Sequence, residues 1–333
     1  MEPLVSILIP AFNSERWVGE AIESALSQTW KAKEIVIVDD GSTDQTLSVA
    51  RKFASTSVSV VTQPNEGAAS ARNKAYSLSQ GDYIQWLDAD DLLAPDKISK
   101  QMKAVADGAT TRTLLSAAWG RFRNRSDRAE FRPSLLWADC RPVEWLLRKL
   151  ENNVYMQTAT WLVSRELTEA AGPWDTRLLS DDDGEYFCRV LLASDRVQFV
   201  EEAKTFYRSS GGGGLSHVGH SDRKLEALFL SLQLHIQYIR SLEESERVRA
   251  ACLVFLQTWL VYFYPEKPAF VEQLEALAAE LGGRLEPPRL SWKYAWIQKL
   301  FGWHSAKRTQ LFYNECRSSV LSSWDGALSR LKI

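Results

Sequence analysis

The sequence predicts an α/β protein with a doubly wound, mainly parallel sheet flanked by helices. Apolar runs typical of buried strands alternate with segments whose apolar residues recur at helical spacing. Two of the apolar runs end in clustered carboxylates, at Asp39-Asp40 and at Asp88 to Asp91. Ligands of such sheets bind beyond the carboxyl ends of the strands, so these clusters mark the expected site.

The first half of the chain is expected to hold four buried strands, at residues 5–9, 34–38, 58–62 and 83–87. A helix within residues 15–29 has Asn13 or Ser14 available as its cap. Ser42 and Gln45 have the spacing of a capping box for a second helix, through about residue 54. A third helix is expected to begin at Gly67.

The second half is expected to begin with strands at residues 114–122, 157–163 and 197–208. A glycine run, Gly211 to Gly214, follows and is either a linker or an active-site lid. From about Asp222 the pattern is helical, and the apolar stripes predict helices near residues 225–236, 247–264 and 270–281. His235 falls within the first of these stripes, where we expect a core histidine with satisfied hydrogen bonds.

Composition limits the class of protein. The 333 residues suffice for one large domain and a smaller one, and the formal net charge of −2 gives no basic footprint for nucleic-acid binding. The four cysteines lie far apart without metal-type pairs, which is typical of a reducing compartment. We expect no signal peptide, because the first strand begins almost at once, and the most apolar long run, residues 251–264, is too short to span a bilayer. We therefore expect a cytoplasmic chain without nucleic acid as a partner.

The acidic cluster Asp88-Ala89-Asp90-Asp91 suggests a metal site. Neighbouring carboxylates repel one another unless a cation lies among them, and Mg²⁺ prefers oxygen ligands. The alternative is a solvated acidic turn with a helix cap. The chain has neither a Gly-x-Gly-x-x-Gly motif nor a Gly-Lys-Ser/Thr loop for phosphates, so a bound nucleotide diphosphate would need a metal instead. Asp90 meets that need.

Four segments, SILIPAFN, EIVIVDDGSTD, NEGAASARN and YIQWLDADD, closely resemble glycosyltransferase family 2 in their order and spacing. Members of that family are inverting enzymes with the GT-A fold. The resemblance is dense over about the first 105 residues and resumes at Gly172-Pro173-Trp174-Asp175 and at residues 182–189. It implies a GT-A domain over residues 1–220, with a nucleotide-binding half to about residue 107 and an acceptor-binding half after it. Residues 221–333 are then a helical C-terminal region.

The resemblance also implies roles for individual residues. Asp40 would recognise the nucleotide base, usually uracil, and Asp88 would hold the ribose. Asp90 would ligate Mn²⁺ or Mg²⁺, and His217, which follows Tyr207-Arg208, is expected to reach the metal or the diphosphate. Other residues expected to line the nucleotide site are Pro10, Ala11, Asn13, Glu15 and Arg72.

Asp183 is the expected catalytic base, by the resemblance and by its chemistry. An inverting transfer needs a carboxylate that takes the proton of the acceptor hydroxyl as it attacks the anomeric carbon. Acidic residues in the first turn of a helix also complement its dipole, so Asp181 to Asp183 could instead be a simple helix terminus. Asp182 stands where the family usually has Glu and is expected to contact the acceptor. Trp161 is a further acceptor candidate, although a tryptophan in a strand is more often part of the core.

The sequence therefore predicts a hexosyltransferase-type enzyme that is metal-dependent and inverting. It would move a sugar from a nucleotide-diphosphate donor, most often a UDP-sugar, to a hydroxyl of a glycan or lipid-linked glycan, as in bacterial surface polysaccharide synthesis. A sugar nucleotidyltransferase would have a Gly- and Lys/Arg-rich loop after the first strand, and residues 10–15 are not one. A non-catalytic sugar-nucleotide-binding protein would have lost Asp90 or Asp183, and both are present.

The last fifty residues suggest a membrane contact. Residues 284–333 carry nine Lys or Arg against three acids, although the whole chain has a net charge of −2. On an ideal helix Trp292, Trp296 and Trp303 would share one face, with Lys299 beside them. Such a helix is typical of a membrane interface, here the inner face of the membrane, although the same face could pack on the catalytic domain.

Overall fold

The computed structural model describes residues 2–209 and 221–288, together with residues 291–294, 296, 297, 299–303, 305–307, 309, 310 and 313. Among them, the central sheet has five strands in the order β3-β2-β1-β4-β8. The pairs among β1 to β4 are parallel, and β8 is antiparallel to β4. The bounds are β1 Val5–Ala11, β2 Lys33–Asp39, β3 Val58–Thr62, β4 Tyr83–Trp86 and β8 Val163–Ser164. The four strands predicted for the first half are confirmed.

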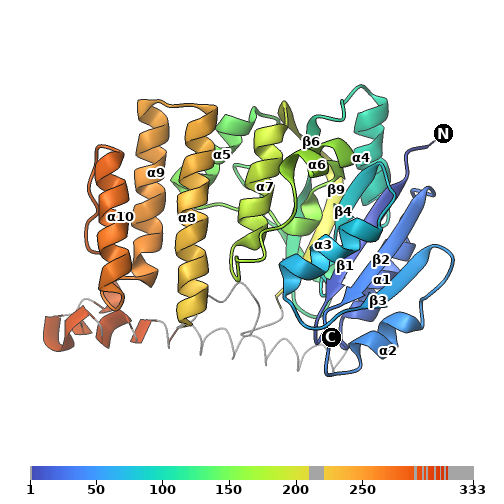
Figure 1. Ribbon diagram of the computed structural model, residues 1–333, viewed down its shortest axis with the longest axis horizontal. Coiled ribbons are helices and arrows are strands. Elements are labelled where there is room, and N and C mark those ends of the chain that lie inside the picture. The colour runs from blue at the N-terminus through green and yellow to red at the C-terminus, as the bar shows by residue number, and fades with distance from the viewer. Residues whose placement is uncertain are drawn as a thin grey trace.

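Helices cover both faces of this sheet, as the buried central strands β1 and β4 require. On one face, Val5, Ile7 and Ile9 of β1 pack with α1 and α4, and on the other face Leu8 packs with α3 and α7. Figure 1 shows these helices around the strands. Their bounds are α1 Val18–Leu26, α2 Thr46–Arg51, α3 Ala68–Leu78, α4 Lys97–Ala106 and α7 Asp182–Ala193. The predicted doubly wound α/β architecture is therefore confirmed.

A second sheet lies against the first and has the order β5-β9-β6-β7. Its centre is the parallel pair of β6 and β9, whose register shifts at Ala117/Ala118. The strands are β5 Leu92–Leu93, β6 Thr113–Phe122, β7 Glu130–Phe131 and β9 Arg196–Arg208. The carboxyl end of β9 reaches the acidic segment after β4, because the backbone N–H of Arg208 donates to Asp91 Oδ1 at 2.8 Å.

Three local predictions within residues 2–209 are wrong. Neither Asn13 nor Ser14 caps α1, whose N-cap residue is Trp17 and has no side-chain cap bond. Residues 157–163 do not form one strand: the 3₁₀ turn η2, Thr158–Thr160, bends the chain between the two sheets, and the backbone N–H of Thr160 donates to Gln157 O at 3.0 Å. Ser42 does not cap the second helix, because its hydroxyl accepts instead from the backbone N–H of Asn13 at 3.0 Å. The N-cap residue of α2 is Gln45, which makes no side-chain cap bond, and Asp44 accepts from the backbone N–H of Thr46 at 2.9 Å.

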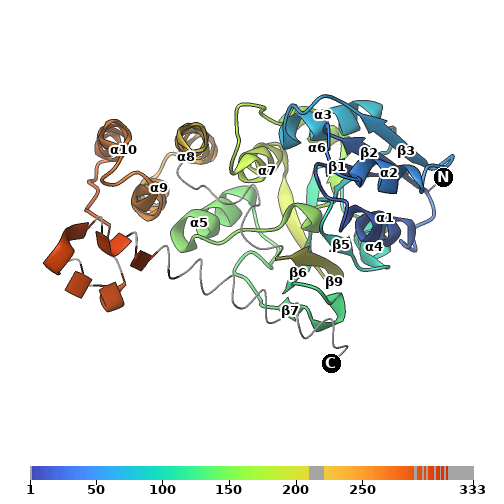
Figure 2. The same ribbon diagram turned by 90° about the horizontal axis from the view of Figure 1, so that it is seen from below.

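The remaining helices extend the molecule away from the central sheet. Figures 1 and 2 show α8, α9 and α10 side by side beyond α7, with α5 next to α8 and α9. The three helices predicted after Asp222 are thereby confirmed, and none of the described helices is long and apolar enough to cross a membrane. The bounds are α5 Pro142–Asn152, α6 Arg165–Ala171, α8 Asp222–Leu242, α9 Glu246–Trp259 and α10 Pro268–Glu280.

Trp292, Trp296 and Trp303 do not share one face. The indole N–H of Trp303 donates to Pro288 O at 3.0 Å, and its ring meets Tyr264 edge-on at 5.1 Å between centroids. Trp292 and Trp296 are 80% and 60% exposed. The ideal-helix prediction fails because Trp292–Tyr294 is a 3₁₀ turn and Gly302 has a φ of +80°.

Candidate functional site

Parallel pairing brings the two acidic clusters to the same edge of the central sheet. β1 lies between β2 and β4, and its last residue, Ala11, is in register with Asp39. The backbone N–H of Asp40 donates to Ala11 O at 2.8 Å. Asp88 follows β4 on the other side of β1. Pro10 and Ala11 thus form the buried floor between the two carboxylate clusters.

Asp40 holds the loop that leads into α3. Its Oδ1 accepts from Gln63 Nε2 at 2.8 Å and from the backbone N–H of Glu66 at 3.0 Å, and its Oδ2 accepts from the backbone N–H of Gly67 at 2.8 Å. The side chain is buried, so these bonds replace its hydration. Asp40 therefore positions the segment that leads to Arg72. It also lies where the nucleotide base is expected to bind.

Asp39 was not predicted as a site residue, yet its carboxylate is the less satisfied of the pair. Its Oδ2 accepts from Thr62 Oγ1 at 3.0 Å, whereas its Oδ1 is buried without a partner among the described residues. A buried carboxylate oxygen without a donor is costly, which indicates that a ligand donor could be accommodated there. The only sequence feature that could have pointed to Asp39 is its position beside Asp40.

Asn13 and Glu15 tie the loop after β1 to the loop after β2. Asn13, which has a φ of 45°, accepts at its Oδ1 from the backbone N–H of Thr43 at 2.9 Å. Glu15 accepts at its Oε2 from the backbone N–H of Gln45 at 2.8 Å. Both side chains are exposed at the edge of the candidate nucleotide site.

Arg72 of α3 connects the candidate nucleotide site to the start of α7. Its guanidinium donates to Asp88 Oδ1 at 2.8 Å and to Asp182 Oδ2 at 2.6 Å, and it lies 4.4 Å from the ring centroid of Trp174. Burial opposes the charge of Arg72, but Asp88 and Asp182 outweigh burial and raise the pKa of the guanidinium. Arg72 is thus a fixed cation between the two halves of the site.

Asp183 lies beside this ion-paired group at the start of α7. Its Oδ1 accepts from the backbone N–H of Gly184 at 2.8 Å, and its Oδ2 faces Thr158 Oγ1 at 3.4 Å. Burial, together with the negative charges of Asp182 and Asp181, raises the pKa of Asp183 to about 7. A carboxyl group with a pKa near neutrality can exchange a proton with a hydroxyl under physiological conditions.

The acidic segment after β4 has a donor set that fits a divalent cation. Burial and the charges of Asp90 and Asp88 raise the pKa of the Asp91 carboxyl, so negative charge is crowded there. Arg208 fixes the segment, since its Nε donates to Asp90 O at 2.8 Å. The described residues contain no group of three converging His, Cys, Asp or Glu side chains. Mg²⁺ commonly uses only one or two carboxylates together with substrate phosphates, which suits this segment. His217 lies outside the described residues.

Trp161 does not have the exposed ring that an acceptor contact requires. It is 1% exposed, stacks on Phe187 at 5.2 Å between centroids and packs against Trp145 at 5.5 Å. The prediction that Trp161 contacts the acceptor is therefore wrong, because its packing leaves no face of the indole for a sugar ring. Asp182 is likewise nearly buried and engaged by Arg72.

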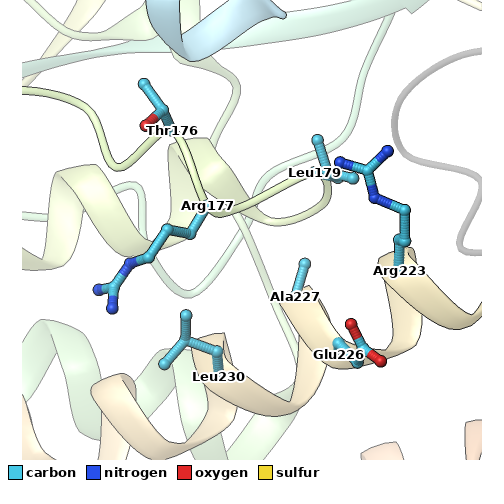
Figure 3. Close-up of a pocket in the computed structure, with 7 residues that line it drawn as sticks. All are labelled: Thr176, Arg177, Leu179, Arg223, Glu226, Ala227 and Leu230. Atoms are coloured by element: carbon cyan, nitrogen blue, oxygen red, sulfur yellow. The ribbon is translucent and has the colours of Figure 1, made fainter.

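A cavity of about 320 Å³ lies between the segment before α7 and the first turns of α8. Figure 3 shows Arg177 and Arg223 at opposite ends of this cavity. A smaller cavity shares Thr176 and Leu179 with it and reaches Asp182 and Gly67. The two cavities are therefore neighbours, one lined by α8 and the other by Asp182 of the carboxylate cluster. The larger one is lined by Thr176, Arg177, Leu179, Arg223, Glu226, Ala227 and Leu230.

Comparisons with known proteins agree with this geometry. Residues 6–170 match the model of the family described as Glycosyl transferase family 2. An uncharacterized glycosyltransferase of Haemophilus influenzae is 39% identical over 103 residues, which cover 30% of this chain and 41% of that protein. The uncharacterized glycosyltransferase EpsJ of Bacillus subtilis is 29% identical over 63% of this chain and 62% of its own length. Chondroitin synthase of Pasteurella multocida is 45% identical over 30% of this chain and 11% of its own length.

Solved structures share the fold at lower identity. S. aureus TarS 1-349 in complex with UDP-GlcNAc has a TM-score of 0.68 and 17% identity, over 84% of this chain and 81% of that one. The matches to the curated relatives span less than two thirds of those relatives' lengths. With the family model matched across both acidic clusters and Arg72, residues 6–170 form a glycosyltransferase family 2 domain.

Proposed function

We propose that this chain is an inverting glycosyltransferase that moves a sugar from a UDP-sugar to a hydroxyl of a glycan or lipid-linked glycan. The observation that carries the proposal is Asp183: a carboxyl group with a pKa near 7 lies beside the ion-paired group of Arg72, Asp88 and Asp182. The printed names of similar proteins support the donor and product classes, namely TarS in complex with UDP-GlcNAc and the chondroitin and hyaluronan synthases of Pasteurella multocida.

In the proposed reaction the acceptor oxygen bonds to the anomeric carbon while the bond from that carbon to the UDP oxygen breaks. Asp183 takes the hydroxyl proton, and UDP leaves with the electron pair of the broken bond. Asp40 and Asp88 bind the base and the ribose, and Arg72 keeps Asp88 and Asp182 in place. The attack and the departure occur on opposite faces of the sugar, so the anomeric configuration inverts.

Mn²⁺ or Mg²⁺, bound through Asp90, would neutralise the charge that develops on the leaving diphosphate. Asp88 belongs to the same segment as Asp90 and is paired with Arg72. A metal bound at this segment would therefore be linked to the ion-paired group of Arg72, Asp88 and Asp182. The donor set is oxygen-based, as these two ions prefer.

For the acceptor, we propose the cavity between residues 176–179 and α8. The smaller cavity beside it is lined in part by Asp182, and two arginines lie at the ends of the larger one. Because Arg177 is paired with Asp175 at 2.6 Å, Arg223 is the cation better able to contact an acceptor. We further propose that the 284–333 tail holds the enzyme at the cytoplasmic face of a membrane, where a lipid-linked acceptor would be found.

The test is a panel of UDP-sugars assayed for UDP release with Mn²⁺, with Mg²⁺ and with EDTA, followed by NMR of the product's anomeric centre. We expect turnover with one or a few donors, inverted configuration and loss of activity in EDTA. UDP affinity measured by calorimetry with and without Mn²⁺ gives a readout that does not depend on turnover. Retention of configuration would contradict the base role of Asp183, and full turnover in EDTA would contradict the metal.

A further inference from the structure

A buried polar chain connects α5 and α8 to the residues that precede the proposed base. Lys149 Nζ of α5 lies 2.9 Å from His235 Nε2 of α8, and His235 Nδ1 lies 2.8 Å from Ser231 O. The Ser231 hydroxyl donates to Asp181 Oδ2 at 2.5 Å. Lys149, Ser231 and His235 are all buried. This chain of contacts ends at Asp181, two residues before Asp183.

The protonation states in this chain are mutually consistent. Burial and the neighbouring Lys149 lower the pKa of His235 to about 4, so its imidazole is neutral. Burial opposes the charge of Lys149, but Cys188 of α7, Asp181 and Asp183 together outweigh it and raise the pKa of the amine. The ammonium therefore donates to Nε2, and Nδ1–H donates to the Ser231 carbonyl. Every hydrogen bond has a donor and an acceptor.

The backbone around Asp181 depends on these contacts. Asp181 has a φ of 56° in the left-handed region and makes no side-chain cap for α7, although it occupies the N-cap position. Its carboxylate turns toward Ser231 and passes over Gly184, where an added Cβ would lie only 2.0 Å from Asp181 Oδ1. A non-glycine residue in this conformation needs surrounding contacts to hold it. Ser231 supplies one of them.

We propose that Lys149, His235 and Ser231 are positioning residues that set the orientation of Asp183 and stabilise its charged form. The inference rests on the proposed function, because it assigns these residues to the same transfer reaction. Ser231 and His235 belong to α8, so the helical C-terminal region takes part in forming the active site. The charged groups that face Asp183 are Asp181 and Asp182 on its own segment, Arg72 on α3, Asp88 after β4 and Lys149 on α5.

The main test compares Lys149→Met with the wild-type enzyme across pH. Removing the ammonium disfavours the carboxylate form of Asp183, so the acid limb of kcat/KM should move to higher pH. We also expect kcat to fall by about tenfold or more, because a misplaced catalytic group reacts less readily, while the KM for donor stays within about twofold. Lys149→Arg keeps the charge and should restore the position of the limb.

Lys97→Met is the matched control. Lys97 is also fully buried, but its partners are Gln85 and the carbonyl of Trp161, and burial alone lowers its pKa. This variant should lower the melting temperature without moving the acid limb. A Lys149→Met enzyme with wild-type kcat and an unshifted limb would overturn the inference.

Ser231→Ala provides a second test if Lys149→Met does not fold. It removes only the hydroxyl that reaches Asp181, so kcat should fall while the melting temperature changes by a few degrees at most. Unchanged kcat in Ser231→Ala would overturn the inference. Absence of transfer by the wild-type enzyme with every donor would overturn the proposed function itself, which is a separate result.

Discussion

Arg72 and Asp182 form a buried ion pair, 2.6 Å between Nη1 and Oδ2, across 110 residues of sequence. The same guanidinium holds Asp88 at 2.8 Å through its other terminal nitrogen. One side chain of α3 therefore fixes the position of the proposed nucleotide site relative to the segment that carries the proposed base. Any change at Arg72 should affect both substrates of the reaction as well as folding.

Arg72→Gln should lose both activity and stability. The change leaves Asp88 and Asp182 close together without their cation, and removing one partner of a buried pair typically costs roughly 3 kcal/mol or more. Thermal unfolding and UDP release measure the two effects. Arg132→Gln is the control, because its pair with Glu130 is exposed on both sides and such pairs contribute little. Equal melting temperatures for Arg72→Gln and wild type would contradict the role of the bridge.

Asp183→Asn should bind UDP normally yet transfer sugar roughly two to four decades more slowly, the usual contribution of a general base. Wild-type activity should rise with pH through about 7, because the base must be deprotonated. The pH profile of kcat/KM and calorimetry with UDP measure both effects. Asp127→Asn, on an exposed 3₁₀ turn, is the control. Near wild-type transfer by Asp183→Asn would leave the residue as part of a helix terminus only.

The raised pKa of Asp183 also predicts how the stability of the fold depends on pH. Folding raises the pKa of Asp183 from its ordinary value of 3.8 to about 7, so the folded protein holds a proton that the unfolded chain releases. The resulting stabilisation is present below pH 4 and is lost as the pH rises through 7. Asp183→Asn removes this buried charge and should melt at a higher temperature than wild type at pH 8. A lower melting temperature at that pH would contradict the assigned shift.

The sequence was sufficient to predict that Asp40 and Asp88 lie at the same edge of the central sheet, because the carboxyl ends of parallel strands meet there. It could not predict that Asp40 would accept three hydrogen bonds from residues 63–67, or that Arg72 would reach Asp182. Those contacts depend on how a loop and a helix pack in three dimensions. Trp161 shows the converse: its residue type suggests sugar stacking, whereas its neighbours Trp145 and Phe187 enclose it.

Asp40 should therefore be tested with two substitutions. Asp40→Ala leaves the backbone N–H groups of Glu66 and Gly67 without their acceptor, which costs about 1–3 kcal/mol for a buried donor. We expect it to lose both UDP affinity and stability. Asp40→Asn keeps the shape and one acceptor oxygen, so it should melt closer to wild type while still binding UDP more weakly. Calorimetry that gives Asp40→Asn the wild-type UDP affinity would reject the base-recognition role.

The last prediction concerns the tail, where the structure separates two kinds of tryptophan. Trp303 is docked on Tyr264, whereas Trp292 and Trp296 are largely exposed in a segment rich in Lys and Arg. Exposed aromatic side chains among basic residues favour an anionic lipid surface. The Trp292→Ser/Trp296→Ser double variant should co-sediment less with phosphatidylglycerol vesicles than the wild-type chain does, with an unchanged melting temperature. Tyr155→Ser, which removes an exposed aromatic residue elsewhere, is the control. Binding of wild type that is equally weak to anionic and neutral vesicles would reject the membrane contact, and it would leave the tail as a structural layer anchored by Trp303.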